Sequence, residues 1–133
     1  MTNIVIDTNI LVSAALSPMG NPAKIADLIS QEVNIQVFYS SGILAEYKRV
    51  LSYERLNISV QVQTAIINTL KEFGILIEPT ASVIPLPDEA DRIFYDTAKA
   101  SEAILITGNI KHYPVEPFIM TPADFLKKIA SSE

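Results

Sequence analysis

Short apolar runs rich in β-branched residues recur along the chain, and most of them end in small polar residues. Runs of this kind predict buried strands, and we expect strands at residues 3–6, 33–39, 75–77, 103–107 and 118–120. Between the runs, apolar residues recur every three or four positions, as they do on one face of a helix. Helices are therefore expected directly after residue 7 and at about residues 22–29, 41–53, 59–73, 88–101 and from 122 onward.

Residues at the ends of the predicted helices support these boundaries. Ser59 is suited to cap the helix at 59–73, and Gly74 is suited to end it. The apolar stripe of this helix that we expect to face the core is Val62, Ile66, Leu70 and Phe73. Because strands and helices alternate, we predict an α/β fold with three α/β/α layers, a mostly parallel central sheet and right-handed crossovers. A chain of 133 residues is long enough for one such domain, over residues 1–133.

Composition limits the class of protein. Apolar residues make up 49% of the chain, which argues against disorder, and no apolar run reaches the roughly 18 residues of a membrane span. The N-terminus lacks the basic and long apolar segments of a secretory signal. Together with the absence of cysteine, these features predict a cytoplasmic protein without a membrane segment.

Composition also constrains the binding of metals and nucleic acids. With no cysteine and a single histidine, His112, the chain cannot form an ordinary zinc site, so a bound metal would be Mg²⁺ or Mn²⁺ held by oxygen atoms. The net charge of −5 argues against a protein that binds nucleic acid by bulk electrostatics. It does not exclude a nuclease whose clustered acids are neutralised by metal ions.

Three acidic residues are predicted to share one edge of the sheet. Asp7 follows the first strand, Glu46 borders the apolar stripe of the helix after the second, and Asp91 opens the helix before the fourth. In an open α/β sheet, ligands bind beyond the carboxyl ends of the parallel strands. Carboxylates crowded there repel one another unless a cation lies between them, so a divalent metal site is expected. The alternatives are that Asp7 only caps the next helix and that Glu46 is a solvated surface residue.

The sequence also carries motifs of a known family. They are residues 6–11 (IDTNIL), 43–47 (ILAEY), 91–98 (DRIFYDTA), 105–109 (LITGN) and 121–126 (TPADFL). With these motifs the chain resembles the PIN-domain ribonucleases of the VapC-like group, the toxins of toxin–antitoxin pairs. The resemblance spans nearly the whole chain. It implies a metal-dependent endoribonuclease that hydrolyses RNA phosphodiester bonds.

The resemblance implies roles for individual residues. The catalytic residues that hold Mg²⁺ or Mn²⁺ would be Asp7, Glu46 and Asp91. Supporting positions around them would be Thr8, Asn9, Thr107 and Asn109. Candidates for contacts with RNA are Lys48, Lys111 and His112, and candidates for outer metal ligands are Asp88 and Asp96. Because Asn109 and His112 occupy a region where relatives often have a further acid, we expect one tightly bound metal and a second only alongside substrate.

The resemblance also implies partners, and other functions stay open beside it. The expected partners are an RNA substrate, an antitoxin protein and a second copy of the chain in a homodimer, for which residues 58–73 are the candidate surface. One alternative is a PIN-like binding module that is catalytically weak or inactive. Another is a phosphatase of the haloacid-dehalogenase type, but that chemistry needs a second aspartate where this chain has Asn9.

Overall fold

The structure, a computed structural model, describes residues 1–131. Its strands are β1 (Thr2–Ile6), β2 (Ile35–Tyr39), β3 (Ile75–Leu76), β4 (Ile104–Ile106) and β5 (Ile119–Met120). Its α-helices are α1 (Thr8–Leu16), α2 (Asn21–Gln31), α3 (Ser41–Leu51), α4 (Val60–Phe73), α5 (Arg92–Ser101) and α6 (Pro122–Ser131). Short 3₁₀ helices in the connections are Glu54–Leu56, Glu89–Asp91 and Ile110–His112.

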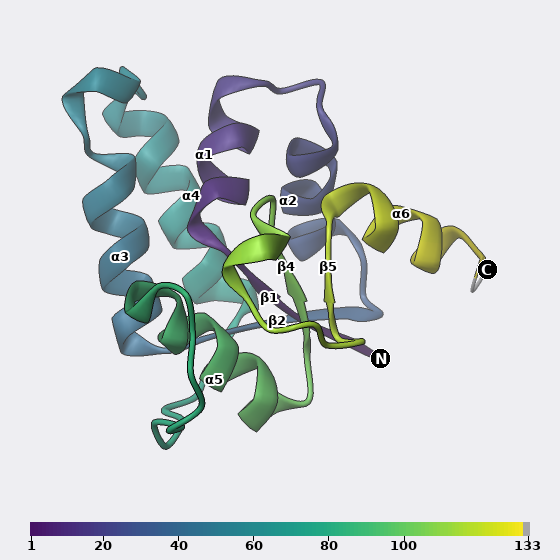
Figure 1. The fold of residues 1–133 in the computed structure, drawn as a ribbon. Helices are drawn as coiled ribbons and strands as arrows, with labels where there is room; N and C mark the ends of the chain where they lie inside the picture. Colours follow the sequence, from purple (N-terminus) through teal and green to yellow (C-terminus); the bar gives the residue numbers. More distant parts are fainter. Residues whose placement is uncertain (132–133) are drawn as a thin grey trace.

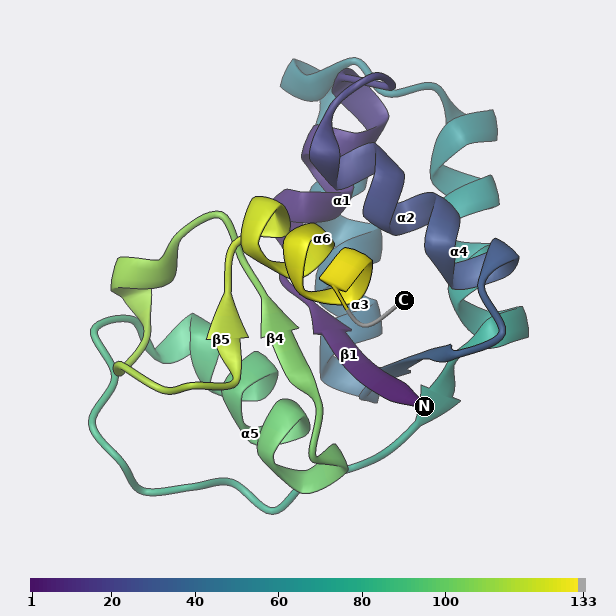
Figure 2. The ribbon, with the colours of Figure 1, turned by 90° about the vertical axis from the view of Figure 1, so that its right-hand side faces the viewer.

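The strands form one parallel sheet in the order β3-β2-β1-β4-β5. At its centre, Ile4 of β1 pairs with Ile104 of β4, and Ile6 pairs with Ile106. Helix α5 contacts β1, β2 and β4, whereas α2 and α4 contact β2. Figures 1 and 2 show α5 on the opposite side of the sheet from α2 and α6. The predicted α/β fold with a central parallel sheet between helical layers is confirmed.

The ends of several elements follow from local hydrogen bonds. The hydroxyl of Ser40 accepts from the backbone N–H of Ile43 at the start of α3, and that of Ser59 accepts from Val62 at the start of α4, each at 3.2 Å. Helix α5 begins later than its sequence pattern predicts, because the Asp88 carboxylate caps a 3₁₀ turn first and accepts from Ala90 N–H at 3.0 Å.

The buried face of α4 differs from the predicted stripe. Val62 and Phe73 are each 41% exposed, whereas Ile67 and Leu70 are buried, so the expectation that Val62 and Phe73 face the core is wrong. The reason is that α4 contacts both α2 and α3, which turns Ile67 inward. Apolar spacing alone does not say on which side of a helix its neighbours lie.

The core lies between the sheet and the helices that cover it. Its largest fully buried side chains include Tyr47 from α3, Phe94 from α5, Phe125 from α6 and Leu105 from β4. These side chains come from both helical layers and from the sheet, so burial ties all of the layers together. Within residues 1–131, every helix is too short or too polar to cross a lipid bilayer.

Candidate functional site

The order of the strands places a crevice between β1 and β4. The chain builds the sheet outward from β1 to β3 and then returns to β4 on the other side of β1. At such a reversal, a crevice forms beyond the carboxyl ends of the two strands. Asp7 follows β1 at this point, and Thr107 follows β4. Both side chains are buried, so the crevice floor is polar but largely shielded from water.

Three hydrogen bonds hold the carboxylate of Asp7 in place. Its Oδ1 accepts from the backbone N–H of Thr8 at 2.8 Å. Its Oδ2 accepts from the hydroxyl of Thr107 at 2.7 Å and from the hydroxyl of Tyr113 at 3.0 Å. Burial raises the pKa of Asp7 above its ordinary value, although these hydrogen bonds and the charge of His112 lower it part of the way. Asp7 therefore caps α1 and at the same time lies in the crevice.

Glu46 reaches the crevice from α3. Its Oε2 accepts a short hydrogen bond from the hydroxyl of Thr8, and its Oε1 lies 3.6 Å from the guanidinium of Arg49. Only 17% of the Glu46 side chain is exposed, so the surface alternative does not describe it. Thr8 thus joins two acids, because its N–H bonds Asp7 while its hydroxyl bonds Glu46.

Asp91 lies beside Asp88 and His112. Each of the three side chains has one potential metal-ligand atom that lies within 4.8 Å of such an atom in both of the others. His112 Nδ1 lies 3.3 Å from Asp91 Oδ2, which is an ion-pair distance. By geometric criteria, the buried Asp91 Oδ2 has no hydrogen-bond partner within residues 1–131, so its contact with His112 is an ion pair.

Electrostatics set Asp91 apart from an ordinary surface acid. Burial is the main cause that raises the pKa of Asp91 to about 6, and the negative charges of Asp7 and Asp88 add to it, while His112 acts in the opposite direction. Asp7 is therefore close enough for its charge to disfavour ionisation of Asp91. A cation between them would remove that cost.

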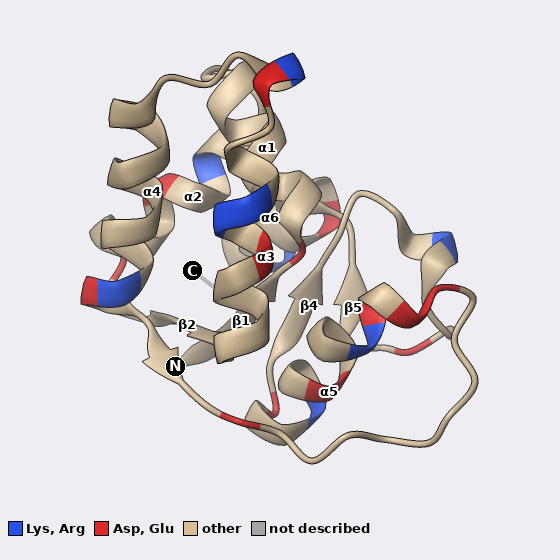
Figure 3. Cartoon of the chain, turned by 90° about the vertical axis from the view of Figure 1, so that its left-hand side faces the viewer, with Lys and Arg blue, Asp and Glu red and all other residues tan. Residues whose placement is uncertain are grey.

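One open cleft, with a volume of about 320 Å³, brings the three predicted acids together. Asp7, Glu46 and Asp91 all line it, although they come from β1, α3 and the turn before α5. Other polar residues that line it are Thr8, Asn9, Arg55, Asp88, Asn109 and His112. Figure 3 shows acidic positions on α3 and on the segment that leads into α5.

The supporting residues connect the two sides of this cleft. Asn9 Oδ1 accepts a long hydrogen bond of 3.4 Å from the backbone N–H of Gly108. The N–H of Asn109 donates to the hydroxyl of Thr107 at 2.9 Å. Thr107 itself is fully buried behind the cleft, where it bonds Asp7. The start of α1 and the turn after β4 are thereby held against each other.

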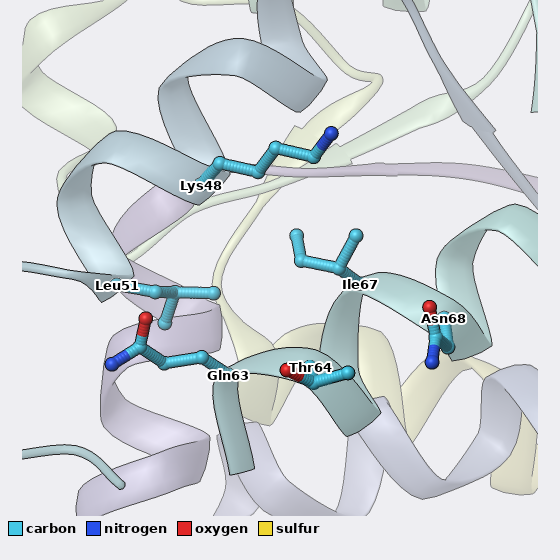
Figure 4. Close-up of a pocket in the computed structure, with 6 residues that line it drawn as sticks. All are labelled: Lys48, Leu51, Gln63, Thr64, Ile67 and Asn68. Atoms are coloured by element: carbon cyan, nitrogen blue, oxygen red, sulfur yellow. The ribbon is translucent and has the colours of Figure 1, made fainter. Parts of the chain in front are cut away.

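Three of the sequence-predicted residues lie away from this cleft. Lys48 lines a separate pocket between α3 and α4, as Figure 4 shows. Lys111 is exposed on the 3₁₀ helix Ile110–His112 and does not line the cleft. Asp96 is buried on α5, where its Oδ2 accepts from the N–H of Ser82 at 2.9 Å. Asp96 therefore fixes a connecting loop and does not reach the acids.

Two residues at the cleft were not singled out from the sequence. Tyr113 is buried and donates its hydroxyl to Asp7. Arg55 lines the cleft, with its guanidinium 5.0 Å from the centre of the Tyr53 ring. Neither belongs to a periodic segment, so the only signal in the sequence for Tyr113 was its place in the turn after a buried strand.

Comparisons with known proteins agree with this architecture. The family model described as PIN domain matches residues 3–111. The chain is 35% identical over 109 residues to an uncharacterized protein of Methanocaldococcus jannaschii, MJ1680, across 80% of this chain and 70% of that protein. It is also similar to a chain in the crystal structure of VapBC2 from Rickettsia felis bound to a DNA fragment from their promoter. That likeness has a TM-score of 0.59 at 18% identity, over 90% of this chain and 97% of the other, and shows the fold.

Proposed function

The chain belongs to the PIN-domain family, and we propose that it is a divalent-metal-dependent endoribonuclease and the toxin of a toxin–antitoxin pair. The observation that carries this proposal is that Asp7, Glu46 and Asp91, from three separate elements, line one cleft. PIN domains are generally nucleases, which supports a hydrolytic role on nucleic acid for this acidic cleft, and we propose RNA as the substrate.

The residues of the cleft fit a divalent cation. Asp91 Oδ2 is a buried carboxylate oxygen without a hydrogen-bond partner among the described residues, and such an oxygen is a ready metal ligand. Asp7, Glu46 and Asp91 would hold Mg²⁺ or Mn²⁺ through their carboxylates. When bound, the cation would neutralise charge on the scissile phosphate and make a water molecule nucleophilic at neutral pH.

The other residues position these acids and the substrate. Thr107 and Tyr113 orient the Asp7 carboxylate, and Thr8 orients Glu46. Arg55 and Asn109 line the cleft and would contact RNA phosphate or sugar groups. Lys48 and Lys111 lie outside the cleft, so contacts with RNA from them require a strand that extends beyond it.

An antitoxin and a second copy of the chain are the proposed protein partners. One solved structure with a matching fold is that of VapBC2, which supports an antitoxin partner here. A net charge of −5 favours a partner whose basic residues enter the acidic cleft. For the homodimer we propose α4, where Val60, Val62 and Phe73 are exposed.

A PIN-like binding module with weak or no catalysis is the second candidate. It is favoured by Asn109 and His112, which replace negative charge near the end of β4 with neutral or basic groups. The two candidates differ in one result, because both would bind a divalent cation but only the nuclease would cleave RNA.

The test is cleavage of RNA by the purified protein with and without Mn²⁺. We expect cleavage only with Mn²⁺, and its loss to background in Asp7→Asn, with Asp27→Asn on α2 as a folded control outside the cleft. Cleavage by Asp7→Asn at the rate of the natural chain would overturn the proposed site. A Mn²⁺-dependent rise in melting temperature without any cleavage would favour the binding module.

A further inference from the structure

We propose that His112 and Asp88 join Asp91 as direct ligands of the divalent cation of the cleft, and that the imidazole nitrogen makes the site favour Mn²⁺ over Mg²⁺. The inference rests on the proposed metal dependence of the cleft. It changes the expectation drawn from the sequence, in which only oxygen atoms held the metal and His112 was a candidate for RNA contact. With a nitrogen ligand, the preference of the site for Mn²⁺ or Mg²⁺ depends on a residue of this chain, His112.

The distance between the His112 and Asp91 donor atoms fits a shared ion. His112 Nδ1 and Asp91 Oδ2 lie 3.3 Å apart. Two atoms bound at right angles to one ion, each at about 2.1 Å, lie about 3.0 Å from each other. An adjustment of a few tenths of an ångström would therefore place both atoms on the same cation. The side chain of Asp88 offers a third donor atom within 4.8 Å of the other two.

The state of Asp91 Oδ2 points in the same direction. This oxygen is buried and, by geometric criteria, has no hydrogen-bond partner within residues 1–131, and its nearest charged neighbour is the ring nitrogen of His112 at 3.3 Å. A buried carboxylate oxygen in this state has a lone pair available for a cation.

The backbone and the exposure of His112 also suit a ligand. The backbone N–H of His112 donates to the carbonyl of Asn109 at 2.9 Å, and this bond fixes the 3₁₀ turn that carries the imidazole ring. The ring is 49% exposed and lines the cleft, so an ion that enters the cleft reaches it directly. Mg²⁺ prefers oxygen ligands and keeps several of its waters, whereas a nitrogen ligand is accepted more readily by first-row transition-metal ions. One imidazole nitrogen beside the carboxylates therefore favours a transition-metal ion such as Mn²⁺ over Mg²⁺.

The single histidine of the chain makes the test direct. The protein, purified without a histidine tag, is loaded with one equivalent of Mn²⁺ and studied by pulsed electron paramagnetic resonance. We expect nuclear modulation from a coordinated ¹⁴N, replaced by a ¹⁵N pattern when only histidine is labelled with ¹⁵N. This measurement needs no substitution and no substrate, so neither misfolding nor activity enters it.

The second test measures by calorimetry how tightly variants of the protein bind Mn²⁺ and Mg²⁺. His112→Ala should weaken Mn²⁺ binding by about tenfold or more while Mg²⁺ binding changes by less than about threefold. Lys111→Ala, on the same 3₁₀ turn but outside the cleft, should retain the affinity for Mn²⁺. Bound Mn²⁺ without a histidine-nitrogen signal would overturn the ligand role of His112 and leave the proposed nuclease intact. No binding of Mn²⁺ at all would overturn both proposals.

Discussion

The hydroxyl of Tyr113 lies 3.0 Å from Oδ2 of Asp7 and donates a hydrogen bond to it. The two residues are 106 positions apart in the chain, so this bond closes the turn after β4 onto the end of β1. Burial and the nearby charges of Asp7 and Asp91 raise the pKa of Tyr113, and the hydroxyl therefore keeps its proton and stays a donor. The orientation of the most buried acid in the cleft thus depends on a residue from another part of the fold.

Tyr113→Phe removes this donor without changing the shape of the core. A hydrogen bond to a charged group contributes about 1.5–3 kcal/mol, so we expect a loss of stability of this order. Because Asp7 keeps only Thr107 on the same oxygen, Mn²⁺ binding should weaken by about tenfold or more. Chemical denaturation and calorimetry measure the two effects. In the control Tyr53→Phe, where the lost hydroxyl makes no hydrogen bond within residues 1–131, neither quantity should change appreciably.

Thr8→Val tests the bridge between two acids. Valine has the shape of threonine but lacks the hydroxyl that donates to Glu46, while the backbone N–H that bonds Asp7 is retained. We expect a stability loss of about 1 kcal/mol and a weaker divalent cation site, measured by denaturation and Mn²⁺ titration. Thr69→Val on α4 removes a hydroxyl bonded only to the Ala65 carbonyl, and it should leave Mn²⁺ binding unchanged. Equal loss of Mn²⁺ affinity in both variants would contradict the bridging role.

The raised pKa of Asp91 predicts how stability depends on pH. A carboxyl whose pKa is higher in the folded state, about 6 here against an ordinary 3.8, binds its proton more tightly when folded. Its contribution to stability is therefore full below about pH 3.8 and is lost as the pH rises through about 6. With chelator present, Asp91→Asn should be more stable than the natural chain at neutral pH by about 1–2 kcal/mol, because the cleft is open to water.

That advantage of Asp91→Asn should shrink as the pH falls towards 4, as denaturation curves at several pH values would reveal. Added Mn²⁺ should reverse the order at neutral pH, because a ligand that binds only the folded state stabilises it. A difference between the two proteins that is constant with pH would show that Asp91 is not the group that titrates.

Gly74 and Gly42 form a matched pair that tests how closely the chain packs against a glycine. A Cβ added at Gly74 would lie 2.4 Å from the carbonyl oxygen of Leu70 and 2.8 Å from the Tyr39 ring. Gly74→Ala should therefore destabilise the fold by about 1–3 kcal/mol. A Cβ at Gly42, inside α3, meets nothing closer than 3.8 Å, so Gly42→Ala should be neutral or slightly stabilising. Thermal melting compares the stabilities of the two variants. Equal melting temperatures would contradict the close approach at Gly74.

Much of the fold followed from patterns that are local in the chain. The strand that ends directly before Asp7 and the helix capped by Ser59 lie where alternating elements and caps predicted them. The buried face of α4 was predicted incorrectly, because Ile67 is turned inward by the position of α3 and not by its own neighbours in sequence. Local patterns identify an element, whereas its packing partners decide which side is covered.

In the candidate site, too, some features could be predicted from local sequence and others depend on packing. The three acids could be proposed from their positions after or beside strands, and the structure brings Asp7, Glu46 and Asp91 to one cleft, while their catalytic role stays a prediction. Lys48 was a reasonable candidate by charge, but the axial rotation of α3 turns it towards α4.

By itself, the sequence determined the order and type of the elements and the presence of carboxylates at strand ends, because periodicity and capping act over a few residues. The tertiary structure alone decided that Tyr113 bonds Asp7 and that His112 lies against Asp91. Such contacts join loops far apart in the chain. Their geometry depends on how the sheet and helices pack, which no short segment of sequence encodes.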